Sequence, residues 1–155
     1  GKPIEGGQKP AKPVDPTPEP GDSKGDKVLK LYESWEVRFA YSQAGGRLDP
    51  LHTGYGDCSS TIWRAYQDAL GVDVGTWTGA MAGKGTQVYH SDHDSVAEAI
   101  AGAHAGDLLL LAWSWRNPSY DHVEMMTGGP GMGPVYKDAA TQMQGAVMWE
   151  IRRYV

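Results

Sequence analysis

The single cysteine, Cys58, is the residue of this chain best suited to nucleophilic chemistry. It follows the turn Tyr55-Gly56-Asp57 and opens an amphipathic pattern that predicts a helix ending before Gly71. A thiol in the first turn of a helix faces unpaired backbone N–H groups and the positive end of the helix dipole, which favour the thiolate. Cys58 is therefore a candidate nucleophile. The alternative is a small buried hydrophobic residue, because free cysteines are often buried.

His122 is the second candidate for catalysis, because it is the one histidine of five that starts a predicted core strand. A histidine at the edge of a strand can reach the start of a helix that packs on the sheet. Paired with Cys58, it would take the thiol proton and later return it to a leaving amine. The alternative is a half-buried strand histidine without a partner.

The elements that must position these residues are helices followed by strands. Apolar residues at helical spacing predict a first helix capped by Asp26 and a short helix at 96–103 capped by Asp94 or Ser95. We expect an antiparallel meander with strands at 108–113, 121–127, 134–138 and 146–155. This order predicts an α+β domain with the cysteine helix packed on one sheet.

Composition predicts one folded domain behind a linker. The chain has 155 residues, enough for a single core. Residues 1–25, rich in proline and charge, are expected to be a disordered linker to a further N-terminal domain, and residues 26–155 the catalytic domain. The net charge of −5 argues against nucleic acid as a partner. No apolar run reaches the roughly 20 residues of a membrane span.

Three other motifs offer weaker candidates for a ligand site. Gly79–Thr86 resembles a phosphate-binding loop, but its first glycine is one residue too close and no buried strand precedes it. Gly128–Gly133 follows a strand but lacks the lysine, so it predicts a hairpin turn. His90–Asp94 holds two histidines that could share a zinc ion, but no second cluster supplies the remaining ligands. We therefore expect neither a metal nor a cofactor.

Four sequence blocks, taken in order, resemble the NlpC/P60 family of cell-wall peptidases. They are Tyr41 with Gly45-Gly46, then Asp57-Cys58-Ser59-Ser60, Ala105-Gly106-Asp107-Leu108-Leu109 and Asp121-His122-Val123-Glu124-Met125. The resemblance covers residues 26–155. It implies a papain-like α+β fold and an enzyme that degrades peptidoglycan in the bacterial cell wall. The second and fourth blocks and the Pro-rich linker look most like a bacteriophage endolysin or a virion-associated hydrolase, made in the host cytoplasm or carried on the virion.

The resemblance implies a role for several residues. Cys58 would be the nucleophile and His122 the general base and acid, while Tyr41 would position the thiol or the oxyanion. Asp57 and Ser59 match positions that line the substrate cleft of the family.

The family's third polar residue, which orients the histidine, normally lies on the strand after the histidine strand. We predict Asp138 in this role, because it falls a similar distance before the last strand. Glu124 is the alternative, since it shares a strand face with His122, and it could instead contact substrate. Trp77 is expected to flank the cleft and to stack on substrate.

The function that the resemblance implies is a cysteine endopeptidase that cuts stem peptides, and we expect the D-glutamyl–diaminopimelate bond as its target. One alternative is an N-acetylmuramoyl-L-alanine amidase on the same fold, and another is a non-catalytic wall-binding module. A papain-like acyltransferase or a toxin effector could use the same Cys58 and His122. The presence of both residues favours an enzyme.

Overall fold

The structure is a computed structural model that describes residues 23–35, 38–115, 119–133 and 138–155. Most of the expected linker, and residues 134–137 of one expected strand, lie outside these ranges. The helices are α1 (Lys24–Glu33), α2 (Pro50–Thr53), α3 (Cys58–Leu70), α4 (Thr78–Met81), α5 (Val96–Gly102) and α6 (Ala139–Gly145). The strands are β1 (Ala40–Tyr41), β2 (Tyr55–Gly56), β3 (Thr86–His90), β4 (Leu108–Ala112), β5 (His122–Met126), β6 (Gly131–Met132) and β7 (Met148–Arg153).

A five-stranded antiparallel sheet carries the core, with its strands in the order β3-β7-β4-β5-β6. The predicted meander is wrong for the last strand, because β7 lies between β3 and β4 and pairs with both. Strand β4 is therefore interior, and all five of its residues are buried. Its uninterrupted apolar sequence reflects that position.

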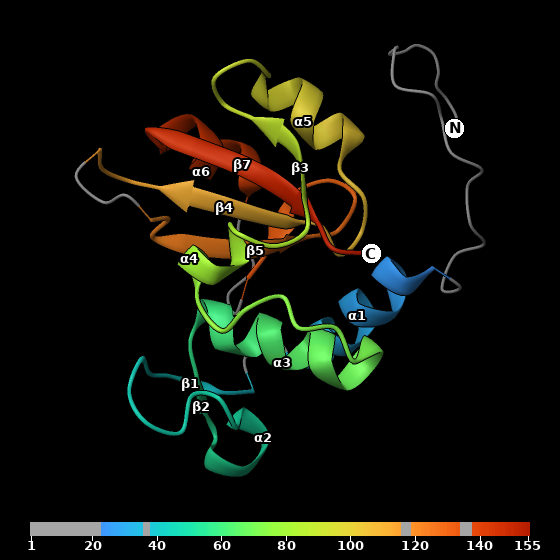
Figure 1. Ribbon diagram of the computed structural model, residues 1–155, viewed down its shortest axis with the longest axis vertical. Helices are drawn as coiled ribbons and strands as arrows, with labels where there is room; N and C mark the ends of the chain where they lie inside the picture. The colour runs from blue at the N-terminus through green and yellow to red at the C-terminus, as the bar shows by residue number, and fades with distance from the viewer. Residues whose placement is uncertain (1–22, 36–37, 116–118, 134–137) are drawn as a thin grey trace.

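Helices cover both faces of the sheet, as Figure 1 shows. Successive residues of a strand point to opposite faces. Leu108 and Leu110 accordingly pack in a core with α1 and α3, whereas Leu109 and Leu111 pack in a second core with α5 and α6. None of the helices in the described ranges has the length and apolarity of a membrane span.

Helix α1 begins at Lys24, three residues before the start that a cap at Asp26 would give. Its N-cap is Ser23, whose hydroxyl oxygen accepts from the backbone N–H of Asp26 at 3.0 Å. Asp26 therefore belongs to the first turn and does not cap the helix, although its negative charge suits that end of the helix dipole. The predicted apolar stripe is confirmed, and its buried members are Val28, Leu29, Tyr32 and Trp35.

Candidate active site

Helix α3 begins at Cys58, as the sequence pattern predicts. The carboxylate of Asp57 accepts from the backbone N–H of Ser60 at 2.8 Å, and the Ser60 hydroxyl accepts from the backbone N–H of Asp57 at 2.9 Å. This reciprocal capping box fixes the first turn of the helix, and with it the position of the thiol. Gly71, with φ of 66°, ends the helix in the left-handed conformation.

Two short parallel strands bring Tyr41 close to the start of α3. Tyr41 pairs with Gly56, and the backbone N–H of Ser42 donates to the Gly56 carbonyl at 2.8 Å. A Cβ on Gly56 would stand 2.6 Å from Cγ2 of Thr61, so glycine is needed for this close approach. Partial burial raises the pKa of Tyr41, and the nearby negative charge of Cys58 raises it further. Tyr41 therefore lies within electrostatic reach of the thiol.

His122 is the first residue of β5, where it pairs with Leu111 of β4. In the described part of the chain, β6 pairs only with residues 125–126 of β5, at the end of the strand away from His122. The His122 ring is a hydrogen-bonding partner of the Cys58 thiol. Its Nε2 atom lies 3.2 Å from Oε2 of Glu124. Because Glu124 occupies Nε2, the other ring nitrogen, Nδ1, is left for the thiol.

These contacts decide the charge of His122. Burial by itself lowers the pKa of the imidazole. The hydrogen bonds with Cys58 and Glu124, together with their negative charges, outweigh burial and raise the pKa from 6.5 to about 9. His122 therefore carries a proton at neutral pH, beside the side chains of Cys58 and Glu124.

Glu124 is completely buried, and one of its oxygens accepts two hydrogen bonds. Oε2 accepts from Nε2 of His122 and from the side-chain amide of Gln142 on α6. Oε1 has no hydrogen-bond partner among the described residues. Oε1 lies against Gly131, where an added Cβ would stand 2.8 Å away. Glu124 thus occupies the place of a residue that orients the histidine, and its burial argues against a direct contact with substrate.

Asp138, the predicted orienting residue, is instead the N-cap of α6. Its carboxylate is exposed and accepts from the backbone N–H of Ala140 and from the hydroxyl of Thr141, each at 3.0 Å. The structure records no contact between Asp138 and His122. An aspartate in this part of the chain could orient the histidine or cap a helix, and here it is the cap.

The residues predicted to bind substrate differ in accessibility. Asp57 and Ser59 are buried, with 6% and 4% of their surface exposed, whereas Trp77 at the start of α4 is 52% exposed. Sequence reasoning missed Arg47, whose Nη1 lies 3.5 Å from Asp57. Both terminal nitrogens of Arg47 also donate to the carbonyl of Thr76, at 3.0 and 2.9 Å. Arg47 therefore ties the segment before Trp77 to the cap of the nucleophile helix.

The His90–Asp94 stretch forms a turn between β3 and α5. Nδ1 of His90 accepts from the backbone N–H of Asp92 at 3.0 Å, and Nδ1 of His93 lies 2.9 Å from the carboxylate of Asp94. Throughout the described residues, no group of three His, Cys, Asp or Glu side chains is placed to hold a metal ion.

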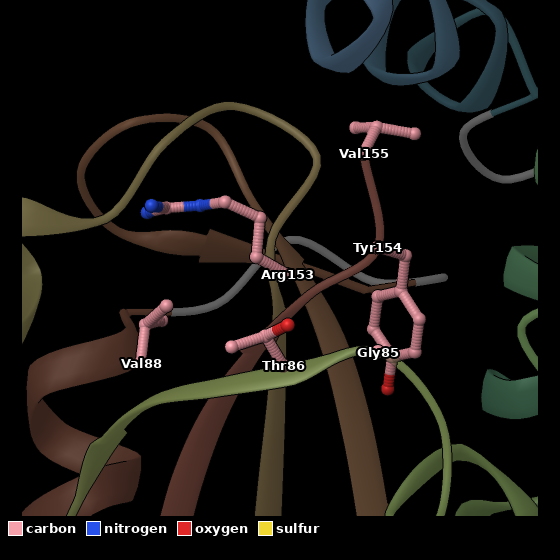
Figure 2. Close-up of a pocket in the computed structure, with 6 residues that line it drawn as sticks. All are labelled: Gly85, Thr86, Val88, Arg153, Tyr154 and Val155. Atoms are coloured by element: carbon pink, nitrogen blue, oxygen red, sulfur yellow. The ribbon is translucent and has the colours of Figure 1, made fainter. Parts of the chain in front are cut away.

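A hollow of about 410 Å³ lies where the start of β3 meets the end of β7, and it shares no residue with the Cys58 site. Figure 2 shows its lining, which includes Arg153 and Tyr154. Arg153 is paired with the buried Asp107 at 2.8 Å, and the Tyr154 hydroxyl donates to the carbonyl of Met81. These two side chains therefore make structural contacts within the fold.

Comparisons with known proteins bear on the fold. No family model and no curated protein matches the sequence. The structure is similar to the NlpC/p60 domain of the peptidoglycan hydrolase SagA, with 24% identity and a TM-score of 0.55 over 81% of this chain and 96% of that one. It is also similar to NlpC2 and NlpC1 from Trichomonas vaginalis, with 18% and 20% identity and TM-scores of 0.64 and 0.65. Each match covers 86% of this chain but only 47% and 45% of those two chains. The chain therefore has the NlpC/P60 fold, a papain-like α+β arrangement of a nucleophile helix on an antiparallel sheet.

Proposed function

We propose that this chain is a cysteine peptidase that hydrolyses amide bonds in peptidoglycan stem peptides. One observation carries the proposal. Cys58 at the start of α3 contacts His122 of β5, and His122 in turn contacts Glu124. Nucleophilic acyl transfer requires a thiol, an imidazole hydrogen-bonded to that thiol, and a group that orients the imidazole. Here a buried carboxylate accepts a hydrogen bond from the other ring nitrogen. SagA, whose domain shares the fold, is a peptidoglycan hydrolase.

The reaction follows from the charge state of the pair. The Cys58 thiolate attacks the carbonyl carbon of the amide and forms a tetrahedral intermediate. Protonated His122 donates its proton to the leaving nitrogen, so that the C–N bond breaks and an amine departs. The thioester that remains is attacked by water, with His122 now accepting the proton. The acid product then leaves, and the thiolate and imidazolium are restored.

The negative charge of the tetrahedral intermediate needs a fixed donor. The backbone N–H of Cys58 lies in the first turn of α3, and no acceptor within the described ranges is recorded for it. We assign it to the oxyanion, since an unpaired N–H and the positive end of the helix dipole both favour a negative oxygen. The exposed Tyr41 is proposed to help position the thiol or the oxyanion, and Trp77 is proposed to stack on the substrate.

For the bond cleaved, we propose the linkage between D-glutamate and diaminopimelate, with the muramoyl–L-alanine amide as the alternative. The NlpC/P60 resemblance of the sequence motivates this choice. The same resemblance motivates a bacteriophage source and a further domain before the Pro-rich segment. On this proposal the chain acts in the bacterial cell wall.

The test is digestion of purified diaminopimelate-type peptidoglycan by the intact chain and by Cys58→Ala, with the released fragments identified by mass. The intact chain should release fragments with new diaminopimelate amino groups, and the variant should release none. Fragments that begin at L-alanine would instead establish the amidase. If both proteins sediment with several wall types and neither releases fragments, the chain is a binding module and the proposal fails.

A further inference from the structure

We propose that Gln142 of α6 is a positioning residue for catalysis, which holds the Glu124 carboxylate in the orientation that fixes the His122 ring. This inference rests on the proposed function and extends its catalytic site to a helix on the opposite face of the sheet. Gln142 does not contact the thiol, and on this proposal it acts only through Glu124.

The first step of the argument is that two donors share one oxygen. His122 and Gln142 both direct a nitrogen at Oε2 of Glu124. An amide nitrogen can only donate, so Oε2 is an acceptor toward Gln142. With Glu124 as acceptor, the proton stays on Nε2 of His122, and Nδ1 is the ring nitrogen left for the thiol.

The second step concerns the other oxygen of Glu124. Oε1 makes no hydrogen bond with any described residue and rests against Gly131. The orientation of the carboxylate therefore depends on the two bonds to Oε2. Without Gln142, only the hydrogen bond to His122 would hold the carboxylate in place. His122 must change its protonation state during the reaction, so that bond alone is a poor anchor.

The third step separates this role from simple anchoring of α6. Ala139 and Met143 are buried in the core between α6 and the sheet, and Asp138 caps the helix. These contacts attach the helix without help from Gln142, which is itself only partly buried. The amide bond to Glu124 is therefore available for positioning.

Within the described ranges, two titratable groups are recorded as acting on His122, so its titration is a readout of this contact. Cys58 faces it from α3, and Glu124 faces it from the same strand. Gln142 carries no charge, so its removal changes His122 only by way of Glu124. If Glu124 rotates away, His122 loses an acceptor and binds its proton less tightly.

The experiment compares Gln142→Met, which keeps the length of the side chain and removes the donor, with Gln144→Met. Gln144 lies on the same helix but is exposed, so it serves as the matched control. His122 is titrated by NMR without substrate, and hydrolysis of peptidoglycan is measured in parallel. For Gln142→Met we expect a lower pKa of His122 and a kcat that falls roughly 10- to 100-fold, as for loss of a bond to a charged group, with KM unchanged. Gln144→Met should match the wild type in both readouts.

An unchanged or higher pKa of His122 in Gln142→Met would overturn the inference. A Gln142→Met protein that does not fold would show a structural role and would overturn it as well. If the wild type fails to degrade peptidoglycan, the proposed function is lost, but the titration still decides whether Gln142 acts on His122.

Discussion

Replacing Cys58 by alanine should lower the pKa of His122, because the thiolate is one of two partners that raise it. The pKa is about 9 in the intact site, although burial alone pulls it down. A hydrogen bond to a charged group is worth about 1.5–3 kcal/mol, and each pKa unit corresponds to about 1.4 kcal/mol. Loss of the thiolate should therefore bring the pKa of His122 to about 7–8. Glu124 stays in place in this variant and keeps the value from falling further.

The assay is a pH titration of the histidine ring signals by NMR in the wild type and in Cys58→Ala. The change removes one sulfur atom from a buried position, so the fold should persist. His52 on α2 is exposed and bonded to Asp49, away from the thiol, and it provides an internal control whose signals should move identically in both proteins. His122 is identified as the signal that disappears in His122→Gln.

The reasoning fails if His122 titrates at the same pH with and without the thiol. That result would mean that Cys58 does not stabilise the protonated imidazole, and the proposed mechanism, in which a thiolate attacks beside protonated His122, would have to be abandoned. A His122 pKa near 6.5 in the wild type would have the same consequence, since the two partners would then do no more than cancel the effect of burial.

Three further predictions follow from the same geometry. Hydrolysis by the wild type should decline as pH rises through about 9, because His122 then loses the proton that it donates to the leaving group; a rate that is constant up to pH 10 would contradict this. Asp57→Ala should lower the free energy of unfolding in urea by about 1–2 kcal/mol through loss of the helix cap, whereas Asp57→Asn, which keeps an acceptor for Ser60, should lose less. Gly131→Ala should reduce kcat while leaving the fold intact, because its Cβ would stand 2.8 Å from the Glu124 carboxylate; full activity in this variant would show that the carboxylate does not need its present position.

Local signals predict the parts of the site that lie within one element. The start of α3 at Cys58 follows from an N-cap residue, an amphipathic pattern and a closing glycine, all within 15 residues of one another. The strand that begins at His122 follows from its apolar run between turn residues. Both candidate catalytic residues therefore follow from the amino-acid sequence alone.

Longer-range features could not be predicted in the same way. The placement of β7 between β3 and β4 depends on which distant strands pair, and no local pattern encodes that choice. Helix α6 is only seven residues long and presents few apolar residues, so its periodicity is weak. Because the sequence did not predict this helix, Asp138 was not recognised as a helix cap. No motif in the sequence marks Gln142 or Arg47 as part of the site.

The choice of Glu124 over a residue on a neighbouring strand has a physical reason. In the described ranges, β6 pairs with β5 only at residues 125–126, and the acceptor recorded for the His122 ring comes from β5 itself. Residues two apart on a strand share a face, and a glutamate two positions after the histidine has the reach to bond its ring. A carboxylate there must be buried, because α6 covers that face, and a buried carboxylate needs donors besides the histidine. The amide of Gln142 is such a donor. An orienting residue on the histidine strand therefore requires a donor from the helix that covers this face of the sheet.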